Sequence, residues 1–574
     1  MKISSITIEK FRSIKKAQIN MHDILAVVGE NNAGKTAVLK AINAVLNYQT
    51  EEMNFINKTH QYAPRNNTYI TICFTDIPDT DLYKDKTYRN TLTLHFIYTY
   101  GDNKKKYYIT KGNEKIAVDD GFMKDLSNDI IYVYIPAERT NNDISWNDAS
   151  IYKQLLINYA SLYNESRDRI SGYVRKATEK IHSSILMKLE DQINILYMQN
   201  KSVDFKLRFP SDLDFTALLD QVKISLNDHN STYELREWGS GTKSLAVIAM
   251  HRANALMKNR SIVLGIEEPE TNLHPQAQKR LIYSLKNDLQ SNETQTIFTT
   301  HSTVLINELS HDDILLVRRK NDSTRDFVST TTQLPSDFWE KYNLEEFKHY
   351  QYFNYKNSDF FFSKFVIIGE SKNDCQVFMK LISDDIGDRI ADISFLNAEG
   401  VESIKYPFFL LRELKIPYIT IVDRDFFFDY LNSKLEDSRN ETTGLPIYKS
   451  ELKDNDVINT IFDSVEKKNN LISAHTQGYR KFFDYIKQYN ILSMNYCLEM
   501  DLTCSYAARE IYYDILNIMP QNKSQIHLLE KNHKAIKRIE NILSILEQIP
   551  RISYPESYLK IKNMIIQEIN NTIV

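Results

Sequence analysis

The segment 24-ILAVVGENNAGKT-36 decides the fold of the first half of the chain. Its five leading apolar residues predict a buried strand, which runs into a glycine-containing loop and then a helix from Gly34 to about Leu46. The stretch 29-GENNAGKT-36 fits the pattern G-x-x-x-x-G-K-[ST]. Gly29 and Gly34 permit a tight loop whose amides face a phosphate, Lys35 would reach the terminal phosphates, and the Thr36 hydroxyl would ligate Mg²⁺. A nucleotide site is therefore expected here.

Three later segments extend this site. In 261-SIVLGIEEPETNLHP-275, Glu267 and Glu268 end an apolar strand. Glu267 would hold the water shell of a metal, and Glu268 would polarise the attacking water. The segment 297-IFTTHS-302 ends a strand in His301, and 239-GSGTKS-244 begins a helix at Ser240. An isolated glutamate pair is more often a solvated strand end, but its place after a phosphate loop favours an ATPase.

Strands and helices alternate around these segments, which predicts an α/β class with a mainly parallel sheet. Strands are expected at 5–8, 68–74, 91–100, 106–110, 129–136, 203–209, 262–266 and 296–299. The charged, nearly glycine-free stretch 151–200 predicts a helical insertion, and 318–332 is expected to be a polar interruption. A second α/β domain is expected from its strands at 364–368, 393–396 and 418–422, with helices from Lys372 and over 402–414. The first domain is expected to span residues 1–335 and the second residues 361–520. A linker is expected at 336–360 and a helical segment at 521–574.

Three acidic motifs follow apolar stretches in the second half. They are 364-KFVIIGESKNDCQVF-378 with Glu370 and Asp374, 417-PYITIVDRDFF-427 with Asp423 and Asp425, and 497-CLEMDL-502 with Glu499 and Asp501. The spacing within each motif is expected to put both carboxylates on the same side. Up to six carboxylates would then converge, and like charges repel unless cations lie between them. Any single pair is more often a solvated loop, but three in this order predict a site for Mg²⁺ or Mn²⁺, because oxygen ligands without His or Cys do not suit zinc.

Length and composition limit the class of protein. At 574 residues the chain is expected to hold about three or four folding units. Hydrophobic residues make up 42% and charged residues 25%, which excludes a largely disordered chain. No window of about 18 uninterrupted apolar residues predicts a membrane span, and four scattered cysteines predict no disulfide framework, so a cytoplasmic location is expected. The net charge of −4 means that any nucleic acid would meet a local basic groove.

The first half resembles the ATPase heads of the ATP-binding-cassette superfamily, in the branch shared by chromosome-maintenance, recombination protein F and overcoming-lysogenization-defect (OLD) proteins. The phrase EEPETNLHP and the opening KFRSIKK are typical of this branch. The signature 239-GSGTKS-244 departs from the transporter form, so a transporter subunit is not expected. The resemblance implies that the helix after Ser240 caps ATP bound to a partner subunit. It also implies that Arg12 touches phosphate and that His301 senses the terminal phosphate. The nucleotide-binding residues implied are Arg12, Gly29, Asn31, Asn32, Gly34, Lys35, Thr36, Ser240, Gly241, Glu267 and His301.

The second half resembles the Toprim fold, and the two halves together resemble the OLD family of ATP-dependent nucleases, including Gabija-type and retron-associated defence nucleases. Ser371 stands where that family usually has glycine, which puts a tight loop in question. The resemblance implies a phosphate-stabilising basic residue late in the domain, and in KNHKAIKRIE we favour Lys534, then Lys531. The catalytic residues implied are Glu370, Asp374, Asp423, Asp425, Glu499, Asp501 and Lys534, with Glu268 in the head.

The resemblance implies an ATP-binding, metal-dependent DNA endonuclease of bacterial antiphage defence, with the nucleotide state of the head gating the Toprim nuclease. Two cations about 4 Å apart would bind the scissile phosphate. The expected cofactors are ATP and Mg²⁺ or Mn²⁺. The expected partners are DNA, further copies of the chain in a homodimer or tetramer, and a defence partner such as a helicase or a retron reverse transcriptase with its DNA, but no membrane. An alternative remains open: an ATP-dependent DNA clamp or sensor with an inactive Toprim site.

Overall fold

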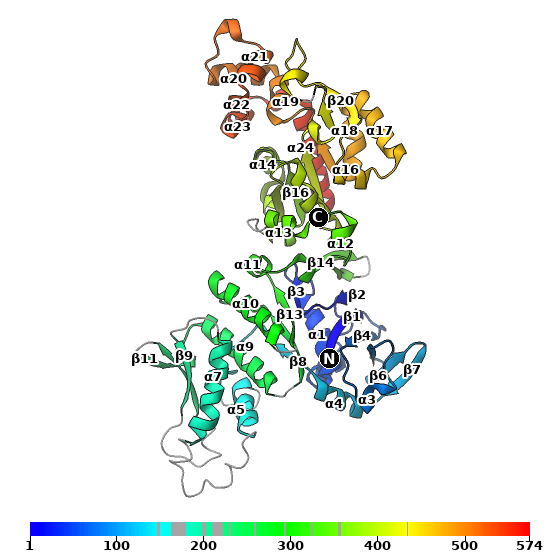
Figure 1. Ribbon diagram of the computed structural model, residues 1–574, viewed down its shortest axis with the longest axis vertical. Coiled ribbons are helices and arrows are strands. Elements are labelled where there is room, and N and C mark those ends of the chain that lie inside the picture. Colours follow the sequence, from blue (N-terminus) through cyan, green and yellow to red (C-terminus); the bar gives the residue numbers. More distant parts are fainter. Residues whose placement is uncertain are drawn as a thin grey trace. The chain divides into compact units, whose positions relative to one another are not determined.

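The computed structural model describes residues 1–145, 150–161, 180–197, 203–208, 222–228, 231–257, 260–291, 294–322, 325–353, 358–432 and 434–573. The chain divides into two compact units, Met1–Gln333 and Leu334–Val574 (Figure 1). Across these described ranges, every helix is too short or too polar to cross a membrane.

Unit 1 is built on one large mixed sheet. Among the described residues its strand order is β7-β6-β5-β4-β1-β2-β15-β14-β3-β13-β12-β8. In chain order the strands are β1 (Lys2–Phe11), β2 (Ile14–Asn20), β3 (Ile24–Val28), β4 (Thr68–Thr75), β5 (Leu92–Thr99), β6 (Lys104–Lys111), β7 (Glu114–Val118), β8 (Ile130–Ile135), β12 (Ser261–Glu267), β13 (Thr294–Thr300), β14 (Ile314–Asp322) and β15 (Arg325–Thr332). Strands β8, β12, β13, β3 and β14 pair in parallel, and β1, β2 and β4 to β7 form an antiparallel wing.

The helices of unit 1 are α1 (Lys35–Leu46), α2 (Tyr48–Ile56), α3 (Asp81–Lys84), α4 (Asp120–Asp129), α5 (Ile151–Ser161), α7 (Met187–Leu196), α9 (Ser240–Leu256), α10 (Pro275–Ser291) and α11 (Thr303–Ile306). Helices α1, α4, α9 and α10 pack against this sheet, and α5 and α7 pack on α9. The described parts of the expected insertion at 151–200 are helical, and residues 162–179 and 198–200 lie outside the described residues. A small separate sheet follows, with strand order β11-β10-β9, formed by β9 (Val203–Arg208), β10 (Lys223–Asp228) and β11 (Ser231–Glu234).

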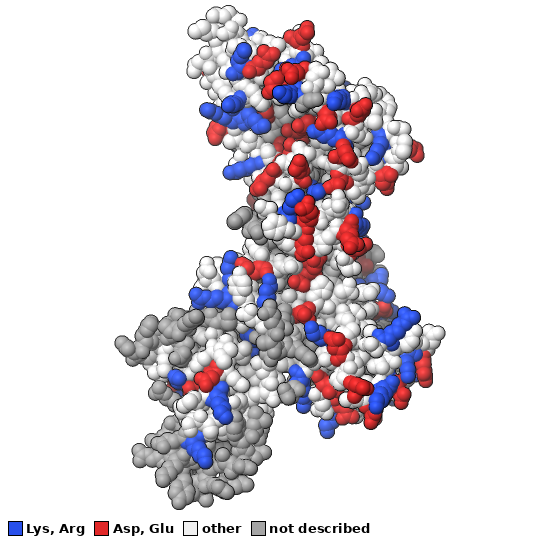
Figure 2. Space-filling view, viewed as in Figure 1, with Lys and Arg blue, Asp and Glu red and all other residues white. Residues whose placement is uncertain are grey.

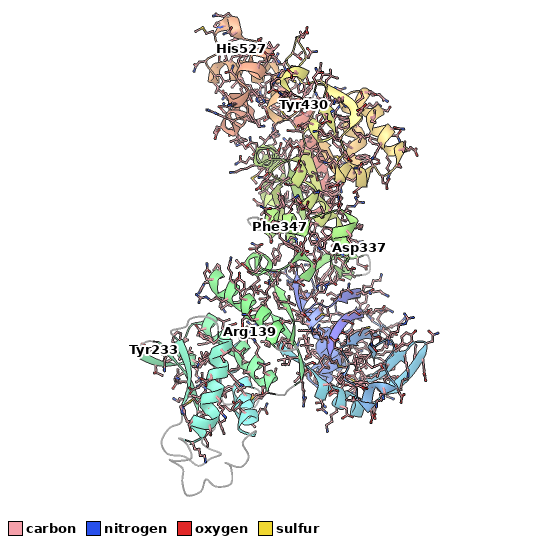
Figure 3. All side chains as sticks on the ribbon, in the orientation of Figure 1. Arg139, Tyr233, Asp337, Phe347, Tyr430 and His527 are labelled. Atoms are coloured by element: carbon pink, nitrogen blue, oxygen red, sulfur yellow. The ribbon has the colours of Figure 1, made fainter. Side chains whose placement is uncertain are left out.

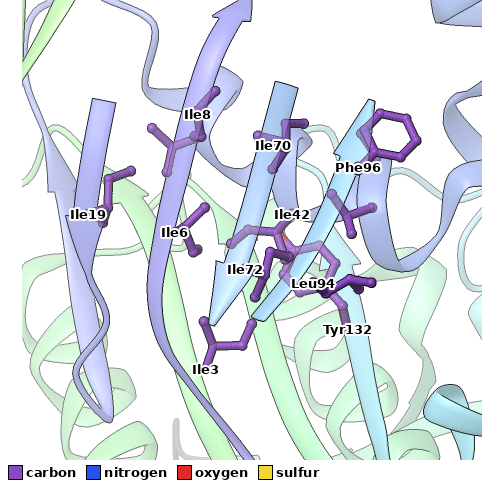
Figure 4. Close-up of a cluster of buried hydrophobic side chains, with 14 of the residues drawn as sticks. Ile3, Ile6, Ile8, Ile19, Ile42, Ile70, Ile72, Leu94, Phe96 and Tyr132 are labelled. Carbon is purple, nitrogen blue, oxygen red and sulfur yellow. The ribbon is translucent and has the colours of Figure 1, made fainter. Parts of the chain in front are cut away.

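Cross-strand rows of branched side chains form the core under the antiparallel wing. Ile6 lies opposite Ile72, and Ile8 lies opposite Ile70, which pairs in turn with Phe96. Figure 4 shows these side chains on one face of neighbouring strands. Each isoleucine is almost fully buried, and such burial contributes roughly 1.5–3 kcal/mol per side chain. The alternating pattern of these strands therefore fixes which face of the wing carries the core.

The polar interruption expected at 318–332 is wrong. This stretch forms the end of β14 and all of β15, which pair as an antiparallel hairpin within the main sheet. The first four residues of β14 are buried beside β3, while the charged residues after them are more exposed. The polar composition of residues 318–332 gave no strand signal, because the buried residues of β14 precede this stretch.

Unit 2 contains a four-stranded parallel sheet of order β17-β16-β18-β21. Its strands are β16 (Phe365–Gly369), β17 (Ile393–Asn397), β18 (Tyr418–Val422) and β21 (Ile491–Ser493), and a separate hairpin pairs β19 (Phe428–Tyr430) with β20 (Tyr448–Leu452). The helices are α12 (Phe338–Lys341), α13 (Glu346–Phe353), α14 (Lys372–Ile386), α15 (Lys405–Glu413), α16 (Asp456–Ile461), α17 (Val465–Thr476), α18 (Tyr479–Ile486), α19 (Leu498–Cys504), α20 (Tyr506–Ile515), α21 (Gln525–Lys531), α22 (His533–Ile536), α23 (Ile539–Gln548) and α24 (Glu556–Thr572). The predicted α/β class of both halves is confirmed.

The strands of this sheet end in register. Gly369 lies opposite both Asn397 and Ile421, and Val422 lies opposite Ser493. Because the strands are parallel, the residues that follow them meet at one edge of the sheet, which is where parallel sheets place ligands.

The segments flanking this sheet pack into unit 2. The stretch 336–360, expected to be a linker, contains α12 and α13, and the Tyr342 ring stacks on Phe409 at a centroid distance of 4.1 Å. The hydroxyl of Tyr352 donates to the carbonyl oxygen of Asn397 at 2.8 Å. Buried side chains of α24 belong to the same core as β16 and α14.

Candidate functional sites

The phosphate loop lies between β3 and α1, and its two glycines are required by close neighbours. A Cβ atom at Gly34, where φ is +108°, would lie 2.3 Å from the Ser329 Oγ. A Cβ atom at Gly29 would lie 2.0 Å from the carbonyl oxygen of Val317. The Ser329 Oγ also donates to the Ala33 carbonyl oxygen at 2.5 Å. The hairpin of β14 and β15 therefore supports the loop directly, and no larger residue fits at either glycine.

Lys35 folds back onto its own loop. Its Nζ donates to the carbonyl oxygens of Gly29 at 3.0 Å and Glu30 at 2.8 Å. Burial lowers the pKa of Lys35 to about 8, although the charges of Glu268 and Glu270 oppose the shift. The ammonium group is therefore held inside the loop, where a phosphate could replace its carbonyl partners.

Glu267 and Glu268 lie where the sequence predicts them, at the end of β12. Glu267 is 9% exposed, and its Oε2 accepts from the backbone N–H of Ala137 at 3.4 Å. Glu268 has a positive φ of 40°, and its backbone N–H donates to the carbonyl oxygen of Thr299 at 3.1 Å. A non-glycine residue in this conformation is strained, and such strain is common at functional sites.

Glu270 is a further carboxylate of this site that sequence reasoning missed. Its Oε1 accepts from the Thr300 hydroxyl at 2.8 Å and from the His301 backbone N–H at 2.7 Å. Burial raises the pKa of Glu270, whereas burial and the charge of Lys35 lower the pKa of His301. The available signal was the third acidic residue of the segment EEPE, to which the sequence analysis assigned no role.

The remaining head residues that the sequence predicts lie on several elements of unit 1. Asn31 and Asn32 are exposed, and Thr36 is half-buried at the start of α1. Arg12 has a positive φ of 51°, and its charge adds to the burial that lowers the pKa of His60. At the start of α9, Ser240 is exposed, and a Cβ atom at Gly241 would lie 2.4 Å from the Asn272 carbonyl oxygen.

In unit 2, Glu370, Asp423 and Asp425 form a compact carboxylate set. Each offers one oxygen atom, and these atoms all lie within 4.8 Å of one another. Glu370 follows β16 and Asp423 follows β18, so the register of the sheet brings them together. The backbone N–H of Asp423 donates to the Glu370 Oε2 at 3.1 Å. The buried Asp423 Oδ1 has no hydrogen-bond partner among the described residues. An all-oxygen set with an unpartnered buried oxygen fits a hard divalent cation such as Mg²⁺ or Mn²⁺.

Electrostatics support this fit. Burial, then the negative charge of Asp425, raises the pKa of Glu370 to about 7. Burial, followed by the charge of Glu370, raises the pKa of Asp423 well above its usual range. A bound cation would remove both penalties, because it favours the ionised carboxylates.

Asp374 lies next to this set, and its carboxylate also stabilises the start of helix α14. Its Oδ2 accepts from both the backbone N–H and the hydroxyl of Ser371, each at 2.7 Å, and the Ser371 hydroxyl accepts from the Asp374 N–H. This is a capping box at the start of α14. Ser371 has φ of −130°, so the loop does not require the glycine that the resemblance implies. Burial raises the pKa of Asp374 to about 6, and the charge of Glu499 acts in the same direction.

The expected same-side placement of Glu499 and Asp501 is wrong. Both lie in helix α19, where residues two apart are about 200° apart, so the two carboxylates diverge. Burial alone would raise the pKa of Glu499, but His533 and Lys537 lower it. Asp501 accepts instead from the backbone N–H groups of Asn495 and Tyr496 and from the hydroxyl of Ser557 on α24, at 2.8, 2.9 and 2.5 Å.

Lys537 is a basic residue that faces Glu499, and sequence reasoning missed it. Its Nζ lies 4.0 Å from the Glu499 Oε1, and the charge of Glu499, with further help from Asp423, raises the pKa of Lys537. The favoured Lys534 lies on the short helix α22, and Lys531 ends α21; both are exposed. The turn between α22 and α23 carries Lys537 toward the site, which the run KNHKAIKRIE did not reveal.

Tyr430, labelled in Figure 3, borders the set. Its hydroxyl donates to the Asp425 Oδ2 at 3.4 Å. Burial and the charge of Asp425 raise the pKa of this hydroxyl, so it stays protonated and is a poor nucleophile.

Two family models match the chain. An AAA ATPase domain model matches residues 1–169 and 131–306. A model of the TOPRIM domain of overcoming-lysogenization-defect-like proteins matches residues 361–425.

Individual relatives share little more than a fifth of their aligned residues with this chain. The chain is 22% identical to an OLD nuclease of Thermus scotoductus over 74% of this chain and 82% of that protein. It is 23% identical to endonuclease GajA of Bacillus cereus over 67% of this chain and 60% of that protein. The chain thus spans less than two thirds of the length of this second relative. Among solved structures, the SmcHead bound to the C-winged helix domain of ScpA matches with a TM-score of 0.43 and 16% identity, covering 59% of this chain and 99% of that one.

Proposed function

This chain belongs to the AAA ATPase domain family and carries an OLD-like TOPRIM domain, and on that premise we propose that it is a metal-dependent DNA endonuclease controlled by an ATP-binding head. The observation that carries the proposal is the carboxylate set Glu370, Asp423 and Asp425 at the carboxyl edge of a parallel sheet. The printed names of both relatives, a nuclease and an endonuclease, support the same activity.

The nuclease chemistry divides among the residues of unit 2. Divalent cations, when bound, supply Lewis acidity and lower the pKa of water, so no side-chain nucleophile is needed. Glu370, Asp423 and Asp425 would hold one cation. Asp374 and Glu499, whose charges both raise the pKa of Asp423, would contribute to holding a second cation. Asp501, with three protein donors, would orient the loop before α19 rather than bind a cation.

Lys537 would stabilise the negative charge that develops on the scissile phosphate. Its Nζ lies 4.0 Å from the Glu499 Oε1, and the charges of Asp423 and Asp374 also raise its pKa. Exposed Lys531, Lys534 and Arg538 lie close to it in sequence, and Figure 2 shows basic side chains over the place of α22 and α23. Such a patch would bind the DNA backbone locally, although the whole chain is slightly acidic.

In the head, the amides of the phosphate loop, Lys35 and the Thr36 hydroxyl would bind ATP and its Mg²⁺. Glu267 would hold the ion's water shell, Glu268 would orient the attacking water, and His301 would contact the terminal phosphate. Exposed Ser240 at the start of α9 would cap ATP on a second copy of the chain. We further propose that ATP state gates cleavage and that the biological role is antiphage defence, which would appear as a loss of phage protection in cells carrying a nuclease-dead variant.

The test is plasmid nicking with Mg²⁺ or Mn²⁺ by the purified full-length protein. Asp423→Ala should abolish nicking but keep ATP binding, and Lys35→Ala should abolish ATP binding but keep the carboxylate set. Glu441→Gln, an exposed carboxylate of the same unit, is the matched control and should nick like the wild type. Wild-type nicking by Asp423→Ala would overturn the nuclease assignment and favour the alternative of a DNA clamp or sensor.

A further inference from the structure

Arg139 lies on the loop after β8, beside the acidic end of β12. Strand β8 pairs in parallel with β12, with Ile135 opposite Ile266. The residues that follow β8 therefore run next to Glu267 and Glu268. Figure 3 labels Arg139 beside α9.

The guanidinium of Arg139 joins three acceptors from two separate elements. It donates to the carbonyl oxygen of Glu267, to the carbonyl oxygen of Glu268 at 3.3 Å, and to the Ser244 Oγ at 2.8 Å. Ser244 is buried in the second turn of α9. Burial lowers the pKa of Arg139 only to about 10, so the side chain stays charged at neutral pH. Its planar fork suits several fixed acceptors, whereas a lysine amine does not reproduce that geometry.

Glu268 needs such support because its backbone is strained. A φ of 40° at a residue other than glycine is strained and persists only where neighbours hold it. The N–H of Glu268 is held by Thr299 on β13, and its carbonyl oxygen is held by Arg139. The peptide units on both sides of the Glu268 side chain are therefore fixed.

We propose that Arg139 is a positioning residue for ATP hydrolysis, which holds Glu268 in its strained conformation and ties it to α9. The inference rests on the proposed function, in which Glu268 orients the attacking water. Because Ser244 and the exposed cap at Ser240 belong to the same helix, a movement of α9 on pairing with a second head would reach Glu268 through Arg139.

The test compares Arg139→Ala and Arg139→Lys with Lys104→Ala, an exposed cation on β6, in the full-length protein. Arg139→Ala should lower kcat for ATP hydrolysis by about 10- to 100-fold with little change in KM, as loss of an outer supporting group does elsewhere. Arg139→Lys should fold normally but still show most of the fall in kcat seen in Arg139→Ala. Lys104→Ala should have the wild-type kcat. Hydrogen exchange without nucleotide should be faster at 267–271 in both Arg139 variants.

The outcomes separate this inference from the proposed function. Unchanged kcat or unchanged exchange at 267–271 in folded Arg139→Lys would overturn the positioning role. A rise in KM with little change in kcat would assign Arg139 to nucleotide binding and would also overturn it. If the wild type hydrolyses no more ATP than Glu268→Gln, the hydrolytic role of Glu268 fails, and the exchange measurement still decides whether Arg139 holds this segment.

Discussion

Lys537 and Lys534 are three residues apart but have different surroundings. Both side chains are exposed, but the Lys537 Nζ lies 4.0 Å from the Glu499 Oε1. Lys537→Ala should reduce DNA cleavage by about 100-fold, comparable to the loss of one preorganised charge-stabilising donor. Lys534→Ala should weaken cleavage only modestly and mainly through DNA binding at low salt. Initial nicking rates at two salt concentrations would distinguish the two lysines, and equal losses for both would contradict this assignment.

The carboxylates of unit 2 give a signed pH dependence. The raised pKa values of Glu370, about 7, and Asp374, about 6, mean that the ion-free folded protein holds protons that the unfolded chain releases. Their stabilising contribution is complete below the unfolded pKa and is lost as pH rises through about 6 to 7. In EDTA, the Tm of unit 2 should therefore decrease as the pH is raised from about 5.5 to about 8.

Cation binding should reverse this trend, since it replaces the lost protons. The rise in Tm on adding Mn²⁺ should be larger at about pH 8 than at about pH 5.5, and scanning calorimetry would measure it. Asp423→Asn should remove most of the Mn²⁺ effect. A Tm gain that is independent of pH would mean that these carboxyls are already ionised without the ion.

At the scale of a single element, the capping box fixes the start of helix α14. Ser371→Ala removes the hydroxyl that caps the helix and should cost about 1 kcal/mol of stability. Ser371→Gly should cost only a few tenths of a kcal/mol, because glycine is a tolerated N-cap. Urea unfolding followed by a probe in unit 2 would measure both. Equal costs for the two variants would show that the cap is not what holds α14.

At the scale of the whole molecule, the exposed start of α9 predicts pairing of heads. Glu268→Gln should bind ATP without turning it over, so the paired state should accumulate. Light scattering should then show a mass increase with ATP that is absent in Lys35→Ala. Ser240→Arg, which places a bulky charge on the capping surface, should prevent the increase. A mass that does not respond to ATP in Glu268→Gln would argue against ATP-driven pairing.

The sequence by itself determined the features that depend on neighbours in the chain. The apolar run 24–28, the glycines of the phosphate loop and the strand 418–422 lie as predicted, because a buried strand and a tight loop leave short-range patterns. The positions of Glu267, Glu370 and Asp423 at the ends of buried strands are also as predicted.

Only the tertiary structure decided which groups meet across long separations. Arg139 reaches Glu267 across 128 positions, and Lys537 approaches Glu499 from a turn between two short helices. Glu499 and Asp501, two residues apart, would lie on the same side of a strand. On helix α19 they lie on opposite sides. The physical reason is that local pattern fixes the type of an element, whereas strand register and helix packing fix the direction of its side chains.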